Sequence, residues 1–137
     1  MKITREYRFY AAHRNEGLVG KCARLHGHRY GVQVDLDLAY SAAGVTIEFC
    51  FIDAQLGPVF EALDHWTLLD ANDELAQRLG PDHVKAFPFP TSAENLAAHL
   101  LGECLNRLPQ CTALRLREND SAVVTVVPDD LKEYPKK

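Results

Sequence analysis

Apolar and polar residues alternate along residues 26–38, and this period of two constrains the fold more than any other feature of the chain. In an extended strand, successive side chains point to opposite faces, whereas a helix would spread the same residues around its circumference. A second run with the same alternation covers residues 3–13. The sequence therefore predicts two strands, each with one apolar face. The apolar face of the second strand consists of Tyr30, Val32, Val34, Leu36 and Leu38.

Two helices and two further strands are expected in the rest of the chain. Apolar residues recur at helical spacing over 50–63, and a second helix opens with a capping box between Thr91 and Glu94. Alternation returns over 112–118 and 122–127, separated by the turn-forming letters "ENDS". These signals predict a second antiparallel hairpin after the two helices.

The connection over residues 71–90 is less regular. It contains a short helix at "DELAQRL" and then the turn-rich stretch "GPDHVKAFPFP". A connection of this length is typical of a loop with a functional role. The element order is therefore ββααββ, which is an α+β pattern, and the 137 residues fit one domain.

Composition and charge narrow the class of function. With 47% apolar and 25% charged residues, the chain has the balance of a globular protein, and it holds no run of about eighteen apolar residues. We therefore expect a cytoplasmic protein without a membrane partner. The formal charge is −4, and Lys and Arg are scattered, so we expect a small-molecule partner and no nucleic acid. The four cysteines form no CxxC pair and are expected to be reduced thiols.

Three histidines fall on the apolar faces of the first two strands. His13 ends the first strand, and His26 and His28 share the parity of the apolar set in the second. If the strands pair, the three imidazoles converge, and three imidazoles with an open fourth position are what a catalytic zinc site requires. The alternative is that all three are hydrogen-bonded core or turn residues. The spacing alone leaves both interpretations open.

Other polar residues are candidates for substrate binding and proton transfer. Glu118 follows two leucines on the inner face of its strand, where it either binds a ligand with N–H donors or forms a salt bridge. Asp64 precedes His65, and a carboxylate can orient an imidazole and make it more basic. Cys22 lies between Lys21 and Arg24, and positive neighbours favour the reactive thiolate. The alternative for Cys22 is a small buried apolar residue.

Five motifs together resemble one family. "FYAAH", "KCARLHGH", "LDH", "PTSAEN" and "RE", in this order and spacing, are similar to the 6-pyruvoyl-tetrahydropterin synthase and 6-carboxy-tetrahydropterin synthase family. The resemblance covers nearly the whole chain. It implies the tunnelling fold (T-fold), in which a four-stranded antiparallel sheet carries two helices on one face. It also implies a homo-oligomer, in which three subunits form a barrel and two such trimers stack into a hexamer.

The same resemblance implies roles for nine residues. They are the zinc ligands His13, His26 and His28, the thiolate Cys22, the acid/base relay Asp64 and His65, the pterin anchor Glu118, and further pterin contacts at Ser92 and Glu94. In this family the relay can reach the site from a neighbouring subunit. The chain departs from the family pattern at Glu48 and Leu69, in the extra residue of "PTSAEN", and in the longer 71–90 connection.

The spacing between Cys22 and His26 resembles the 6-carboxy-tetrahydropterin branch, which leads toward 7-deazaguanine compounds such as queuosine. The activity implied is a zinc-dependent lyase that converts 7,8-dihydroneopterin triphosphate to 6-carboxy-tetrahydropterin, acetaldehyde and triphosphate. One alternative is 6-pyruvoyl-tetrahydropterin synthase, which eliminates triphosphate without breaking a C–C bond. Another is a catalytically silent module that binds a pterin or purine.

Overall fold

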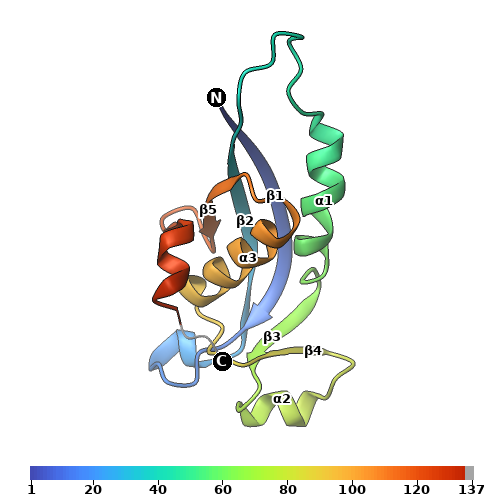
Figure 1. Ribbon diagram of the computed structural model, residues 1–137. Helices are drawn as coiled ribbons and strands as arrows, with labels where there is room; N and C mark the ends of the chain where they lie inside the picture. The colour runs from blue at the N-terminus through green and yellow to red at the C-terminus, as the bar shows by residue number, and fades with distance from the viewer. Residues whose placement is uncertain (135–137) are drawn as a thin grey trace.

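A six-stranded sheet with the strand order β4-β3-β1-β2-β5-β6 forms the centre of the computed structural model, which describes residues 1–134. The strands are β1 (Lys2–His13), β2 (His26–Asp37), β3 (Trp66–Asp70), β4 (Val84–Phe87), β5 (Cys111–Arg117) and β6 (Val124–Val126). The α-helices are α1 (Phe49–Glu61), α2 (Glu74–Leu79) and α3 (Ala93–Arg107). Figure 1 shows the long β1–β2 hairpin with α3 lying across it and the β3–α2–β4 unit at one end. Among residues 1–134, no helix combines the length and the apolarity that crossing a membrane requires.

The β1–β2 hairpin is confirmed, except that β2 ends at Asp37 and leaves out Leu38 of the predicted strand. Its antiparallel register runs from Lys2 opposite Asp37 to His13 opposite His26. β5 then pairs antiparallel with β2, and β6 with β5. The four strands predicted from alternation therefore lie side by side in the sheet, as the ββααββ pattern requires.

The apolar face of these strands is covered by α1 and α3. Both helices bury apolar residues against it, and the side chains at the centre are fully buried because they lie between the sheet and a helix. The largest of them are Phe9, Tyr30, Leu36, Ile52, Leu56, Phe60, Leu96, Leu100 and Leu114. The opposite face of β1, β2 and β5 has no helix over it among the described residues (Figure 1). We call these two surfaces the covered face and the open face.

The prediction of four strands and two α-helices was wrong in number. The 71–90 connection contains α2, as expected at "DELAQRL", but β4 follows it, and β3 precedes it. β3 pairs parallel with β1 at Ala11–His13, and β4 pairs parallel with β3. Strands of five and four residues are too short to show alternation, and parallel strands buried on both sides do not alternate. The sheet is therefore mixed instead of wholly antiparallel.

The start of α3 also differs from the predicted capping box. The N-cap is Ser92, whose side chain accepts a hydrogen bond from the Asn95 backbone N–H at 3.3 Å. The Thr91 hydroxyl is fully buried and donates to the Leu68 carbonyl of β3 at 3.0 Å. Thr91 is therefore held by a strand that alternation does not reveal, and the Thr91–Glu94 box does not form.

Candidate functional site

The structure brings the three histidines together at one end of the covered face. His13 ends β1 and lies opposite His26, the first residue of β2, and His28 shares the parity of His26. One ring nitrogen from each imidazole lies within 4.8 Å of the other two. The predicted convergence is confirmed, and it follows from strand register alone, since paired residues in an antiparallel hairpin project to the same face.

Backbone carbonyls orient two of the rings. His13 Nδ1 lies 2.7 Å from the Thr91 carbonyl oxygen, and His26 Nδ1 lies 2.7 Å from the Arg24 carbonyl oxygen. A carbonyl only accepts hydrogen bonds, so each Nδ1 carries the proton and each Nε2 keeps a free lone pair. A carbonyl that holds the distal ring N–H is the usual outer support of a metal-binding histidine.

The inward nitrogens of the cluster have no hydrogen-bond partner. Among the described residues, His13 Nε2 and His28 Nε2 are buried and unpartnered. Burial lowers the pKa of both imidazoles, which favours their neutral form. Neutral imidazoles with unused lone pairs suit Zn²⁺, so the donor set fits this metal.

Glu118 lies beside this cluster, one residue beyond the end of β5. Its carboxylate oxygens are 3.5 Å from His13 Nε2 and 3.9 Å from His28 Nε2. These contacts are too long for strong hydrogen bonds, and neutral imidazoles carry no charge to pair with a carboxylate. The side chain is 24% exposed, so Glu118 faces both the imidazoles and the solvent. It can accept N–H groups from a ligand that enters next to the cluster.

Asp64 and His65 form a hydrogen-bonded pair away from the cluster. Asp64 Oδ2 accepts from His65 Nδ1 at 2.8 Å, and Asp64 Oδ1 accepts from the Tyr10 backbone N–H at 2.8 Å. The Tyr10 and His65 bonds keep the pKa of the Asp64 carboxyl below its usual value. His65 adopts a left-handed backbone conformation (φ 64°), and its side chain is 78% exposed.

The Asp64–His65 pair is not on the same face as the histidine cluster. The His65 ring lies 5.9 Å from the ring of Tyr10, which has the opposite parity to His13 along β1. Tyr10 and His13 are three residues apart, about 10 Å along a strand. Within one subunit, the structure therefore brings Glu118 to the three histidines but leaves this pair beside the open face.

Cys22 lies in the loop that leads into β2. It belongs to the short 3-10 helix Gly20–Ala23 and is exposed, four residues before His26. Its carbonyl oxygen accepts from the Asn15 backbone N–H at 3.0 Å. At the start of the loop, Arg14 forms a bidentate pair with Asp73, the N-cap of α2. The β3–α2–β4 unit therefore anchors the segment that carries Cys22.

Ser92 and Glu94 line a cavity of about 700 Å³ with residues of this loop. Arg14 and Asn15 form its other side, directly after His13 in the chain. Glu118 does not line this cavity but a different one. The predicted substrate contacts therefore line two different cavities.

Sequence reasoning missed one polar group in this region. Tyr30 is fully buried and stacks on Phe9, and its ring lies 5.4 Å from that of His28. Among the described residues, its hydroxyl has no hydrogen-bond partner. Its parity with His28 was visible in the sequence, but a tyrosine on an apolar face is usually a core residue.

An α+β chain with antiparallel strands, helices on one face and three convergent imidazoles defines a protein with a candidate metal centre. The family model described as 6-pyruvoyl tetrahydropterin synthase matches residues 2–129, and the chain belongs to this family. A 6-carboxy-5,6,7,8-tetrahydropterin synthase from Haemophilus influenzae is 36% identical over 107 residues, which are 70% of this chain and 76% of that protein. One from Rickettsia bellii is 33% identical over 114 residues, covering 79% and 83%.

Solved structures support the same fold. An uncharacterized protein from Wolinella succinogenes aligns with a TM-score of 0.81 at 19% identity, covering 93% of this chain and 98% of that one. The 6-pyruvoyl tetrahydropterin synthase of Caenorhabditis elegans aligns with a TM-score of 0.73 at 20% identity, covering 93% and 94%. These likenesses support the T-fold predicted from the motifs.

Proposed function

We propose that this protein is a zinc-dependent 6-carboxy-5,6,7,8-tetrahydropterin synthase that acts on 7,8-dihydroneopterin triphosphate and serves the route to queuosine. The observation that carries the proposal is the cluster of three convergent imidazoles beside the Glu118 carboxylate, in which the buried Nε2 atoms of His13 and His28 have no hydrogen-bond partner among the described residues. The relatives at 33–36% identity that bear this name support the branch.

His13, His26 and His28 would hold the zinc ion through Nε2. Bound zinc supplies a Lewis acid, which polarises the oxygens of the substrate side chain and makes neighbouring C–H groups more acidic. The Thr91 and Arg24 carbonyls keep two of the rings in the tautomer that binding requires. The role of the protein here is to present three lone pairs from a rigid hairpin.

Proton transfer is assigned to Cys22 and to the Asp64–His65 pair. The exposed Cys22 thiol would take a proton from the substrate side chain as a thiolate. Asp64 holds the Nδ1 proton of His65, which leaves His65 Nε2 free to accept or return a proton. The pair lies beside the open face of its own subunit, so we propose that it serves the site of a neighbouring subunit.

Glu118 would anchor the pterin. A carboxylate can accept two N–H bonds from an aminopyrimidine edge, and a pterin held there would bring its side chain toward the three histidines. Ser92 and Glu94 would add contacts from the cavity that they line with Arg14 and Asn15. The Ser92 side chain also caps α3, so its contact would be secondary.

A homo-oligomer would complete the sheet and the site. Among the described residues, β1 has β2 on one side, and on the other side β3 pairs only with Ala11–His13. The outer edge of residues 2–9 and the edge strand β6 are therefore free, and free edges favour pairing with another copy. We propose a homohexamer built from two trimers, with residues 1–137 acting as one domain in the cytoplasm.

The decisive experiment is turnover by the zinc-loaded protein. Incubation with 7,8-dihydroneopterin triphosphate should release triphosphate and acetaldehyde and leave 6-carboxy-tetrahydropterin, identified by mass. Release of triphosphate with a 6-pyruvoyl product and no acetaldehyde would reassign the protein to the 6-pyruvoyl branch. Tight pterin binding without any turnover would identify a silent binding module instead.

A further inference from the structure

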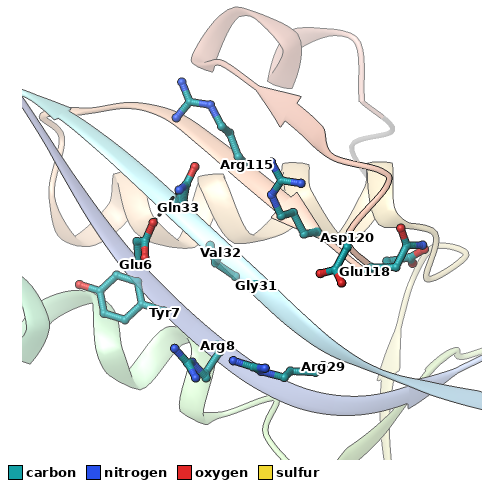
Figure 2. Close-up of a pocket in the computed structure, with 12 residues that line it drawn as sticks. Glu6, Tyr7, Arg8, Arg29, Gly31, Val32, Gln33, Arg115, Glu118 and Asp120 are labelled. Carbon is teal, nitrogen blue, oxygen red and sulfur yellow. Dashed lines mark hydrogen bonds between the residues drawn. The ribbon is translucent and has the colours of Figure 1, made fainter.

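The open face of the sheet carries arginines in register on three neighbouring strands. Arg8 of β1 lies opposite Gly31 of β2, and Gly31 lies opposite Arg117 of β5. One row further along the hairpin, Arg29 lies opposite Tyr10. These residues, apart from Tyr10, line a cavity of about 560 Å³ on this face. Figure 2 shows the side chains of Arg8 and Arg29 next to each other, both on one side of Gly31.

Three of these arginines have no carboxylate partner. Four other arginines are paired with carboxylates, among them Arg115 with Asp35 and Arg5 with Asp53. Among residues 1–134, Arg8, Arg29 and Arg117 take part in no ion pair and no side-chain hydrogen bond. All three side chains are exposed, so their guanidinium groups are available to a ligand.

Gly31 lies between Arg8 and Arg117, and neither its backbone conformation nor crowding requires a glycine there. Its φ is not in the left-handed region, unlike that of Gly20, Gly44 and Gly80. A Cβ built at Gly31 would meet only the Arg117 Cβ, at an ordinary 3.8 Å. Glycine inside a strand costs stability, and it often marks a place where a ligand approaches the backbone. Gly31 therefore leaves a hollow in the floor of the cavity, between the strand positions of Arg8 and Arg117.

The acidic groups of the cavity lie around this hollow. Glu6 accepts a hydrogen bond from Gln33 Nε2 at 2.6 Å, one row away from Gly31. Glu118 is turned toward the imidazoles, and Asp120 lies beyond the end of β5. The cavity therefore has four arginines against three carboxylates, and only Arg115 of the four is paired with a carboxylate among the described residues.

We propose that Arg8, Arg29 and Arg117 form a binding site for a chain of phosphate groups over Gly31, separate from the histidine cluster. Guanidinium forks match phosphate oxygens bidentately. Arg8 and Arg117 stand two strand spacings apart, about 9.5 Å, and Arg29 lies one row away, which suits several phosphates better than one. The net charge of −4 disfavours a long nucleic acid at this face. The proposal does not depend on the proposed reaction.

Calorimetric titration with sodium tripolyphosphate tests this site on the full-length protein. Arg8→Gln and Arg117→Gln should each weaken binding by at least about tenfold, because each removes a charge-assisted contact. Arg78→Gln is the matched control on α2 and should bind as the unchanged protein does. Gly31→Val should weaken binding while the melting temperature stays the same or rises, because valine favours a strand but fills the floor.

Further titrations identify the kind of phosphate ligand and distinguish the arginine site from the histidine cluster. If tripolyphosphate binds as tightly as ATP, the site recognises the phosphate chain alone. If ATP binds more tightly and both arginine variants weaken its binding, the ligand is a nucleoside triphosphate. Binding should persist in His26→Ala. Binding that is lost in His26→Ala, unchanged in both arginine variants or unchanged in Gly31→Val would overturn the proposal. So would a single-stranded RNA 20-mer that binds more tightly than tripolyphosphate.

Discussion

The covered and open faces of the sheet share the same strands but support opposite chemistries. On β2, His28, Tyr30 and Val32 point to the covered face, where burial keeps imidazoles neutral and packs side chains against α1 and α3. The residues between them, Arg29 and Gly31, point to the open face, where the guanidinium group stays charged and exposed. One strand therefore carries the His28 imidazole and the Arg29 guanidinium on opposite faces, with their backbones about 3.3 Å apart along the strand.

The two faces differ in whether their buried polar groups have hydrogen-bond partners. On the covered face, the atoms without a hydrogen-bond partner among the described residues, His13 Nε2, His28 Nε2 and Tyr30 Oη, belong to three rings that lie 5.1 to 6.0 Å apart. On the open face, the one deeply buried carboxylate, Asp35, is satisfied by Thr4 and Arg115. Unsatisfied polar atoms therefore point to a function, and satisfied ones to stability.

The largest effect should come from the metal ligands of the covered face. The native protein should hold about one zinc per chain, and His26→Ala should lose most of it, since two imidazoles leave the tetrahedral set incomplete. Elemental analysis of the purified protein measures this, with His83→Ala, an exposed histidine outside the cluster, as the control. Full zinc occupancy in His26→Ala would rule out the cluster as the metal centre.

Substitutions at two neighbouring residues of β5 should show that the covered face contributes more to the free energy of unfolding than the open face does. Leu116 is 1% exposed on the covered face, so Leu116→Ala should lower the free energy of unfolding by about 2–5 kcal/mol. Arg117 is exposed on the open face, so Arg117→Ala should change it by less than about 0.5 kcal/mol. Urea titrations of both variants make the comparison. Equal losses would show that another element covers the open face in solution.

Glu118 lies beside the histidine cluster and also lines the cavity of the open face. A variant at this residue tests the proposed pterin anchor. Glu118→Gln should weaken pterin binding about a hundredfold. The substitution removes the negative charge, and its amide N–H group faces the N–H groups of the pterin, so one hydrogen bond is lost. Calorimetry with sepiapterin measures the affinity, and Glu61→Gln on α1 is the exposed control. Zinc content should stay unchanged. Lower zinc content would make Glu118 a metal ligand, and unchanged affinity would remove it from the pterin site.

The smallest expected effect concerns Asp35 and depends on pH. Burial opposes ionisation of this carboxyl, but hydrogen bonds from Thr4 and Arg115 outweigh it and hold the pKa below its usual value. The carboxylate therefore contributes stability above about pH 4, the pKa range of an unfolded aspartate, and this is lost as pH falls through the folded pKa.

Asp35→Asn should accordingly destabilise the protein by roughly 1–2 kcal/mol at pH 7, because Arg115 loses its charged partner. The difference between the two proteins should shrink below pH 4. Unfolding curves at pH 7 and pH 3 give the comparison, and Asp37→Asn, which is exposed at the end of β2, is the control. A difference that persists at pH 3 would show that the aspartate acts through packing instead of charge.

Most of the histidine cluster could be predicted from the sequence, and the reason is local. The alternation that defines β1 and β2 also defines the parity of His13, His26 and His28, and the register of one hairpin brings them together. Parity also singled out Glu118, which follows the strand that pairs with β2, and the resemblance to the family added its role as pterin anchor. The place of the Asp64–His65 pair beside Tyr10 was not predictable, because it depends on a hydrogen bond that spans 54 residues.

The sequence by itself determined the phase of each long strand, and with it which side chains share a face. This information is local because the period of two follows from the geometry of an extended backbone. Only the tertiary structure decided that β3 and β4 join the sheet, that Thr91 binds Leu68, and that the Thr91 carbonyl orients His13. Those contacts join segments 23 and 78 residues apart, and short parallel strands acquire their partners only when the whole sheet forms.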